Sequence, residues 1–468
     1  MTDVQDKLQD EDASAEEEGA AHSYGLNDEI VQEIQDAIER EDAAFIHDTL
    51  EDWYSADTAD LIEQLKPKLR LQFLQIMKGR LDPDVYSDLD ENVRDHLVED
   101  MDAAEIAAFV NELEIDDAVD VLEDLEEDEQ REVLREIPAD DRAALQEGLS
   151  YSEDSAGRLM QRNLIAVPEY WNIGQTIDYL RDTDDLPDEF YEIFVVDPRH
   201  HPIGTIPLNH AMRSKRHVAV RDIMDEEQKL IPVDMDQEDV AYLFQQYRLT
   251  SAAVVNADGA LIGVITVDDI VDVISEEAEE DILRLGGVTE DDLFGSIWST
   301  SRSRFLWLFV NLLTAIAASV AISFFDATME AIIALAILMP IVASMGGNAG
   351  TQTMTVAVRA LATKELTAAN MFRILSKETV VALLNGVVFA VLIGGIAWLW
   401  FDDRQIGVII AVAMVFNILV AGVAGMLVPV TLDRMNIDPA IASSVFVTTV
   451  TDIVGFVAFL GLATFVLL

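Results

Sequence analysis

An isolated carboxylate, Asp452, interrupts the uncharged stretch VFVTTVTDIVGF near the end of the chain. A charged side chain at bilayer depth costs about 2.5–3.5 kcal/mol on insertion scales. On a helix, Ser444, Thr448 and Gly455 share a face with it and form a polar stripe of small residues. Such a stripe faces a bundle interior or a water-filled path. The apolar runs contain no Lys or Arg to pair with Asp452. This favours a cation path over the alternative, a structural aspartate that is hydrogen-bonded to neighbouring helices.

A second polar group interrupts an earlier apolar run, LMPIVASMGGNAGTQT. Pro340 can kink a helix, and the GGN triplet that ends at Asn348 loosens it. Irregular backbone at membrane depth is tolerated only inside protein or beside water. Glycine also serves close helix packing, but proline, GGN and Gln352 together indicate an irregular, buried segment more specifically than a glycine pair alone. The fourth apolar run adds a polar residue, Asn417.

One carboxylate per chain is too little to hold a bare divalent ion. Mg²⁺ loses its waters reluctantly and often binds through one or two carboxylates plus water. We therefore expect a two-fold dimer, the commonest oligomer, in which two copies of Asp452 face one axis. Such a ring attracts hydrated cations and repels anions.

The apolar half of the chain reads as membrane-spanning. Runs of about 20 apolar residues can cross ~30 Å of hydrocarbon. Five such runs lie near 305–325, 329–348, 379–401, 406–430 and 439–467. Basic residues concentrate in cytoplasmic loops, so we expect the N-terminal part in the cytoplasm of the cell, the C-terminus outside, and a multi-pass protein of the plasma membrane. The loops assigned to the cytoplasm carry Arg302, Arg304, Arg359, Lys364, Arg373, Lys377 and Arg434.

The formal charge of −57 is concentrated in the first part of the chain. Residues 1–300 carry 78 acidic and 22 basic side chains, whereas residues 301–468 carry 9 and 8. Extreme negative charge keeps proteins soluble in high salt, so the composition predicts a halophilic prokaryote. Most single acids are then solvated surface, and their number alone locates no metal site. The start of the chain lacks a signal-peptide pattern and predicts a disordered acidic tail over 1–25. The chain has no cysteine, which excludes disulfides and thiolate metal sites.

Two repeats organise the soluble part. Leu113, Leu125, Ile137 and Leu149 recur every twelve residues among short amphipathic segments with acidic turns. Units of this kind cannot bury a face alone, so they predict a small helical superhelix, with an ordinary bundle as the alternative.

A second repeat covers 152–275, where FVVDPRHHPIGTIPLNH parallels AVVNADGALIGVITVDD. Each copy predicts two short strands, a turn and a helix, and the pair resembles tandem CBS domains. In such domains the pattern G-h-h-T-x-x-D, where h is apolar, can hold an adenosine nucleotide such as ATP. The second copy has it as Gly263, Thr266 and Asp269, while the first has Pro207 and His210 at the last two positions. The alternative is a purely structural CBS pair.

An acidic helix, VDDIVDVISEEAEEDILRLGGV, is predicted to lead from the second repeat to the membrane. Like charges three and four residues apart repel on one helix face. Salt, a basic partner or divalent cations must screen them, and hard cations prefer such oxygen ligands. The halophilic surface is the alternative explanation. The acids that share this face are Asp269, Asp272, Glu276, Glu280 and Asp281.

This order of parts resembles the MgtE family of magnesium channels. The resemblance covers nearly the whole chain after the tail and is carried by YSEDSAGRLM, GVITVDDIVDVISEEAEEDI, PIVASMGGNAGTQ and VTTVTDIVGF. It implies a homodimeric, Mg²⁺-selective channel whose pore acid is Asp452 and whose second span lines the pore with Asn348. It also implies that the linking helix acts as a plug, which cytosolic Mg²⁺ holds shut by bridging acids. The acids so implied are Asp116, Asp120, Asp236, Glu238, Asp269, Asp272, Glu277, Glu280 and Asp281.

Two positions depart from the family pattern. Arg248 stands where an acid can occur in the second CBS copy, and we expect an internal salt bridge there to replace one ion. Ser444 stands where some members place an asparagine near the pore mouth. In high salt, screening weakens repulsion between acids, so gating would need more Mg²⁺ or more acids.

The predicted architecture is multi-domain: a helical superhelical N-domain, tandem α+β CBS domains, an acidic plug helix and a five-span helical membrane domain. Its predicted boundaries are 1–25, 26–150, 151–217, 218–275, 276–300 and 301–468. No catalytic His/Ser/Asp constellation or phosphate-binding glycine loop stands out, so we do not expect an enzyme. Two functions compete with a magnesium channel: a coupled transporter for another divalent ion such as Co²⁺, and a membrane-anchored nucleotide sensor.

Overall fold

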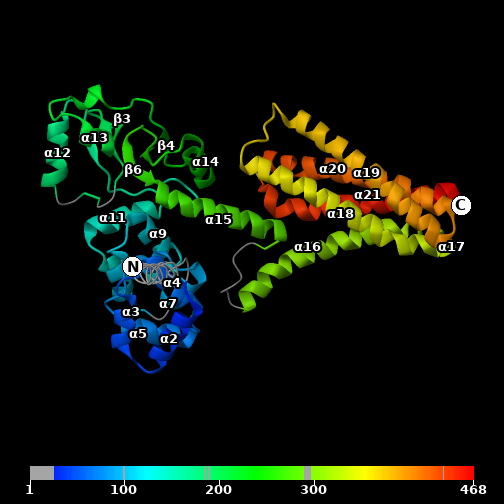
Figure 1. The fold of residues 1–468 in the computed structure, drawn as a ribbon, viewed down its shortest axis with the longest axis horizontal. Coiled ribbons are helices and arrows are strands. Elements are labelled where there is room, and N and C mark those ends of the chain that lie inside the picture. Colours follow the sequence, from blue (N-terminus) through cyan, green and yellow to red (C-terminus); the bar gives the residue numbers. More distant parts are fainter. Residues whose placement is uncertain are drawn as a thin grey trace, which may run out of the picture. The chain divides into compact units, whose positions relative to one another are not determined.

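The structure is a computed structural model that describes residues 26–98, 101–183, 186–187, 190–288, 297–435 and 437–467. The chain divides into two compact units, Met1–Val271 and Asp272–Leu468 (Figure 1). The acidic tail predicted over 1–25 lies outside the described residues.

The first unit opens with short helices whose spacing follows the predicted repeat. Four consecutive helices begin at Ala103, Ile115, Glu127 and Ala139, twelve residues apart. Each is too short to be stable alone, so its stability comes from packing one apolar face on its neighbours. The helices are α2 (Asp28–Glu39), α3 (Ala43–Leu50), α4 (Ser55–Gln64), α5 (Pro67–Met77), α6 (Asp84–Ser87), α7 (Glu91–Val98), α8 (Ala103–Val110), α9 (Ile115–Glu123), α10 (Glu127–Glu136) and α11 (Ala139–Gly148).

Two three-stranded sheets follow and repeat one plan. In each, the first strand pairs parallel to the second and the second antiparallel to the third. The register shifts at Val195/Val196 in one sheet and at Val254/Val255 in the other, which confirms the internal duplication. The strands are β1 (Ala166–Pro168), β2 (Glu192–Val196), β3 (Pro202–Pro207), β4 (Leu230–Pro232), β5 (Ser251–Val255) and β6 (Leu261–Thr266); their helices are α12 (Ile173–Asp182), α13 (Leu208–Arg213), η1 (Val220–Asp222) and α14 (Gln237–Tyr247).

The acidic linking helix, α15 (Val267–Gly286), starts directly after β6. It begins nine residues before the boundary predicted at 276, and it continues without a break through the point where the two compact units meet. The helix therefore belongs in part to the second CBS repeat.

The second unit contains five helices that are long and apolar enough to cross a membrane, as predicted. The long helices are α16 (Ile297–Ser323), α18 (Ile333–Ala362), α19 (Met371–Phe401), α20 (Arg404–Arg434) and α21 (Pro439–Leu467), with the short α17 (Asp326–Ala331) between the first two. α20 packs against α18, α19 and α21. More than half of its apolar window is buried, 56%, against 6% for α16, so α20 is the central helix of this unit.

The expectation of irregular backbone in the second span is wrong. α18 is one continuous helix from Ile333 to Ala362 with Pro340 inside it. Proline removes one backbone donor, and membrane helices tolerate this loss because neighbouring groups satisfy the freed carbonyl. Gly346 in this segment instead makes room for a side chain of α20.

Candidate functional sites

Asp452 lies in α21 and is partly buried within a single protomer. Among the described residues its carboxylate has no hydrogen-bond or ion-pair partner. One turn earlier, the exposed Thr448 donates its hydroxyl proton to the backbone oxygen of Ser444 at 2.8 Å. Hydroxyl, carbonyl and carboxylate oxygens thus follow one another along this face. The Ser444 carbonyl is already hydrogen-bonded, so the Asp452 carboxylate and the Thr448 hydroxyl oxygen are the groups here that could accept from a hydrated cation.

Gly455, the fourth member of the predicted stripe, belongs to packing. It is buried, and a Cβ on it would lie 2.8 Å from Nδ2 of Asn417 on α20. A Cβ on Gly346 of α18 would lie 2.3 Å from the same nitrogen. Two glycines on two helices therefore make room for one fully buried carboxamide. Asn417 uses that room to donate a hydrogen bond to the backbone oxygen of Val342 at 2.8 Å.

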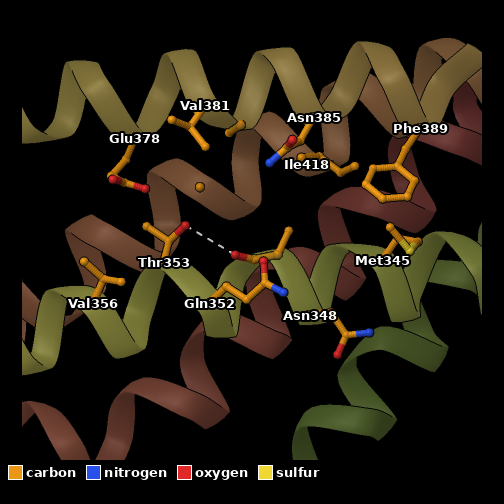
Figure 2. A pocket seen from close by; sticks show the side chains of 13 residues that line it. Met345, Asn348, Gln352, Thr353, Val356, Glu378, Val381, Asn385, Phe389 and Ile418 are labelled. Carbon is orange, nitrogen blue, oxygen red and sulfur yellow. Dashed lines mark hydrogen bonds between the residues drawn. The ribbon is translucent and has the colours of Figure 1, made fainter.

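Asn348 is exposed on α18 within a single protomer, and its Nδ2 lies 3.4 Å from the hydroxyl of Ser344. It lines a cavity between α18, α19 and α20. Its carboxamide lies at the edge of this cavity and points away from α19 (Figure 2). Within one protomer the structure does not bring Asn348 and Asp452 into a hydrogen bond.

Three aspartates gather in the first unit, where α9 approaches the start of α15. Asp116 and Asp117 are consecutive residues of α9, and both are in repulsive range of Asp269. Burial, followed by the charge of Asp269, raises the pKa of Asp116 well above its usual range. The same two causes raise the pKa of Asp117 to about 7. Of the predicted sensing acids, Asp116 and Asp269 are thus brought together.

This site is strained rather than complete. Oδ1 of Asp116 is buried and has no hydrogen-bond partner among the described residues. Asp269 instead accepts from the Thr266 hydroxyl at 2.9 Å and from Nε2 of Gln161 at 3.5 Å. In the described part of the chain, no group of three or more His, Cys, Asp or Glu side chains has an arrangement that could hold a metal ion. A divalent cation would need the carboxylates to rearrange around it.

Asp120, another predicted sensing acid, already has a cation beside it. Nη1 of Arg94 lies 2.6 Å from Oδ2 of Asp120, and Nη2 lies 2.5 Å from Oδ2 of Asp124. The Arg94 side chain is 6% exposed and that of Asp120 is 63% exposed. The guanidinium therefore ties α7 to α9 and neutralises Asp120, which the sequence alone did not indicate.

The predicted acids of the second CBS copy cap a helix. Asp236 precedes α14 and accepts a hydrogen bond from the backbone N–H of Glu238 at 3.0 Å, and both side chains are exposed. Arg248 ends α14 in a left-handed conformation, with φ of 55°. It forms no ion pair among the described residues, so the expected internal salt bridge at Arg248 is absent from them.

The acids of α15 in the second unit approach the start of α21. Arg284 contacts Glu280 one turn earlier, and its Nη1 lies 2.5 Å from Oδ2 of Asp438. Burial, followed by the charges of Asp438 and Glu277, raises the pKa of Asp281. Oδ1 of Asp438 also accepts from the N–H of Ala440 at 2.7 Å. One acid, Asp438, thus joins the linking helix to the helix that carries Asp452.

The nucleotide pattern of the second CBS copy has a structural use as well. A Cβ on Gly263 would lie 2.7 Å from Sδ of Met160, and one on Gly204, its equivalent in the first copy, 2.8 Å from the backbone oxygen of Asp225. Because neither glycine has a side chain, each leaves room for the segment that crosses its strand. Packing therefore accounts for Gly263, while Thr266 and Asp269 bond to each other.

Sequence comparison gives a consistent result. The MgtE family, described as a divalent cation transporter, matches residues 339–462, the MgtE intracellular N domain matches 53–154 and the CBS domain matches 220–276. The magnesium transporter MgtE of Enterococcus faecalis is 30% identical over 320 residues, which cover 68% of this chain and 71% of that protein. The chain belongs to the MgtE family. The MgtE of Thermus thermophilus is 29% identical over 451 residues, covering 94% of this chain and 99% of that protein.

Solved structures of MgtE soluble parts are similar to about half of the chain. One, a cytosolic domain of the Mg²⁺ channel MgtE in complex with ATP, is 27% identical and covers 52% of this chain and 99% of its own, with a TM-score of 0.48. Another, the soluble part of a magnesium transporter, is 24% identical with a TM-score of 0.46, and it covers 53% of this chain and 98% of its own.

Three acids of this MgtE family member escaped the sequence reasoning. Asp117 was visible as the second acid of IDDAVDVL, and Asp438 as an acid directly before a proline, the pattern of a helix start. Glu378 was placed one residue outside the third predicted span, but α19 begins at Met371 and includes it. The structure thus puts Glu378 inside a candidate membrane span, as it does Asp433 and Asp452.

Proposed function

We propose that this MgtE family member is an Mg²⁺ channel of the plasma membrane that is closed by cytosolic Mg²⁺. The observation that carries the proposal is Asp452, a carboxylate in a candidate membrane span that has no protein partner among the described residues. Mg²⁺ keeps several waters and often binds through one or two carboxylates. The relatives' names, which give magnesium as their ion, support Mg²⁺ over Co²⁺.

The conducting form in this proposal is a homodimer. A single Asp452 attracts a hydrated cation weakly, whereas two copies across a two-fold axis double the local charge. The exposed Thr448 hydroxyl extends that surface along α21. The positive-inside rule places the soluble unit in the cytoplasm and the C-terminus outside, and the acidic composition supports a halophilic source.

Cytosolic Mg²⁺ closes the channel by binding where carboxylates repel one another. Asp116, Asp117 and Asp269 stabilise their packed arrangement only when a cation or protons neutralise them. Beside α21, Asp281 is repelled by Glu277 and Asp438, so a cation or protons would stabilise this arrangement in the same way. Mg²⁺ that binds the packed state more tightly than the separated one shifts the population towards it. The remaining acids proposed to contribute are Asp236, Glu238, Asp272 and Glu280.

ATP is the proposed ligand of the second CBS copy. The support is the pattern Gly263, Thr266 and Asp269. Asp269 would leave Gln161 to bind a ribose hydroxyl, and it is the same carboxylate that faces Asp116.

The test is Mg²⁺ uptake into proteoliposomes that hold the wild-type chain or Asp452→Asn. We expect strong wild-type uptake, about tenfold or greater loss in Asp452→Asn, and suppression by millimolar Mg²⁺ on the cytoplasmic face, as differential ion binding requires. Glu330→Gln, in the short helix α17 between two spans, is the matched control and keeps full uptake. Uptake that survives Asp452→Asn unchanged contradicts the pore assignment. Uptake of Co²⁺ that depends on a Na⁺ or H⁺ gradient replaces the channel with a coupled transporter.

A further inference from the structure

An open cavity of about 270 Å³ with polar and apolar lining lies between α18, α19 and α20 in the membrane unit (Figure 2). Glu378 and Asn385 project into it from α19 towards α18. Its thirteen lining residues include one acid and no Lys or Arg. A cavity of this size has room for several waters. The polar lining residues are Asn348, Gln352, Thr353, Glu378 and Asn385.

Glu378 lies seven residues after the start of α19, in the candidate span Met371–Phe401. This places it roughly 10 Å along the helix, at a rise of 1.5 Å per residue. Its side chain is 13% exposed, so its charge is largely removed from the surroundings of the protein. Nζ of Lys377 lies 3.6 Å from Oε1 of Glu378, but the lysine side chain is 73% exposed. A lysine so exposed can leave, and the carboxylate then needs another cation.

Two carboxamide side chains that line the cavity could also bind a water or an ion. Among the described residues, the side chains of Gln352 and Asn385 have no hydrogen-bond partner. The Thr353 hydroxyl donates to the backbone oxygen of Ala349 at 3.3 Å, which leaves its oxygen free to accept. Both carboxamide side chains are exposed in a single protomer, so their amide groups are available to water or to the hydration shell of an ion. One carboxylate with amide and hydroxyl oxygens around several waters is the ligand set that a hydrated Mg²⁺ ion favours.

We propose that this cavity is a binding site for a hydrated divalent cation, with Glu378 as its charged ligand. The site is separate from Asp452, which lies on α21 and does not line the cavity. It lies towards the membrane face where α18 ends and α19 begins, because Glu378 is near that end of α19. Lys377 holds the carboxylate when no ion is present and releases it when the ion arrives. The inference rests on the proposed function for the identity of the ion, but not for the presence of the site.

The absence of native cysteine makes a direct test possible. Glu378→Cys introduces the only thiol, and a cationic methanethiosulfonate reagent reacts with it only if water and cations reach the cavity. We expect Glu378→Cys to react, which reports access to the cavity. Because that variant lacks the charged ligand, protection is measured in Asn385→Cys, which keeps Glu378; Mg²⁺ should slow its reaction by about fivefold, the effect of an interaction worth ~1 kcal/mol. Val380→Cys is the matched control: it lies on the same helix, is 55% exposed, does not line the cavity and is expected to face lipid. It should not react. Asn385→Cys also reports access to the cavity if Glu378→Cys does not fold.

Uptake measurements separate this inference from the proposed function. Glu378→Gln is expected to raise the Mg²⁺ concentration for half-maximal uptake by about fivefold, while Glu378→Asp, which keeps the charge, recovers most of the loss. Equal melting temperatures of the three proteins exclude a structural cause. If wild type carries Mg²⁺, Glu378→Gln matches it within about twofold, and Mg²⁺ gives no protection of the cavity thiol, the site is refuted and the proposed function stands. If wild type carries no Mg²⁺ but Mg²⁺ protects the thiol, the site stands and the proposed function fails.

Discussion

Asn417 donates its buried side-chain amide to the backbone oxygen of Val342 at 2.8 Å, which joins the central helix α20 to α18. The oxygen of the same carboxamide, Oδ1, is buried and has no partner within the described ranges. The glycines at 346 and 455 give this side chain its space. The GGN motif therefore serves helix packing through its first glycine and reaches the neighbouring cavity through Asn348.

Gly346→Ala should destabilise the membrane unit by about 1–3 kcal/mol, because the new methyl group overpacks against Asn417. Gly347→Ala is the adjacent control: a Cβ there meets nothing within 4 Å. It should be neutral or slightly stabilising, since alanine favours helix over glycine. Adding Asn417→Ala to Gly346→Ala should cost less than the sum of the two changes. Thermal unfolding in detergent measures this double-mutant cycle, and strict additivity would contradict the packing relationship.

Arg94→Met should destabilise the first unit by about 2–4 kcal/mol, because it removes a buried guanidinium that pairs with both Asp120 and Asp124. We expect millimolar Mg²⁺ to restore part of that stability. The control is Arg131→Met, whose ion pairs with Glu127 and Asp128 are exposed and contribute less than about 1 kcal/mol. Chemical denaturation of the full chain with and without Mg²⁺ measures both the loss of stability and the part that Mg²⁺ restores. An Arg94 variant as stable as the Arg131 variant would show that the bridge is dispensable.

Acid should stabilise the packing around Asp117. Its folded pKa of about 7 lies above the ordinary value of 3.8, so between these pH values the folded state binds more protons than the unfolded state. The free energy of unfolding therefore falls as pH rises from about 4 to 7, by at most ~1.4 kcal/mol per pH unit for one group. Mg²⁺ competes with those protons, so chelation should lower the melting temperature more at pH 7.5 than at pH 5.5.

Asp117→Asn is the variant that checks this origin. It removes one repelling charge near Asp269, so it should raise stability near neutral pH and flatten the pH dependence. Asp141→Asn, a surface change elsewhere in the same unit, serves as the control and should leave the profile unchanged. A pH profile that is the same in the wild type and in Asp117→Asn would assign the titration to another group.

Arg284→Gln should weaken the closure of the proposed channel by Mg²⁺. The guanidinium bridges Glu280 and Asp438, so its loss removes one attachment between α15 and the start of α21. We expect the Mg²⁺ concentration that halves uptake to rise by about three- to tenfold, the effect of 0.7–1.4 kcal/mol. Arg304→Gln is the control for a lost positive charge on this side of the membrane. Unchanged inhibition in Arg284→Gln would mean that the contact does not take part in gating.

Much of the architecture was predictable because it depends on local periodicity. The twelve-residue recurrence predicted short helical units, and the structure has helices that begin twelve residues apart, at Ala103, Ile115, Glu127 and Ala139. Five apolar runs predicted five long helices, and the paired CBS motifs predicted two equivalent sheets. The predicted ends of the spans were less accurate. A charged side chain such as Glu378 is assigned to a loop when the sequence does not show that it lines a cavity inside the helix bundle.

The sequence by itself determined the parts and their chemistry: an isolated carboxylate in the last span, acids at helical spacing before the first, and a family signature across both. Tertiary structure decided which of those groups have partners. It paired Asp120 with Arg94, set Asp116 against Asp269, and brought Asp438 to Arg284. Each of these relations joins residues more than twenty positions apart, and it depends on burial and charge at contacts that no local pattern in the chain records.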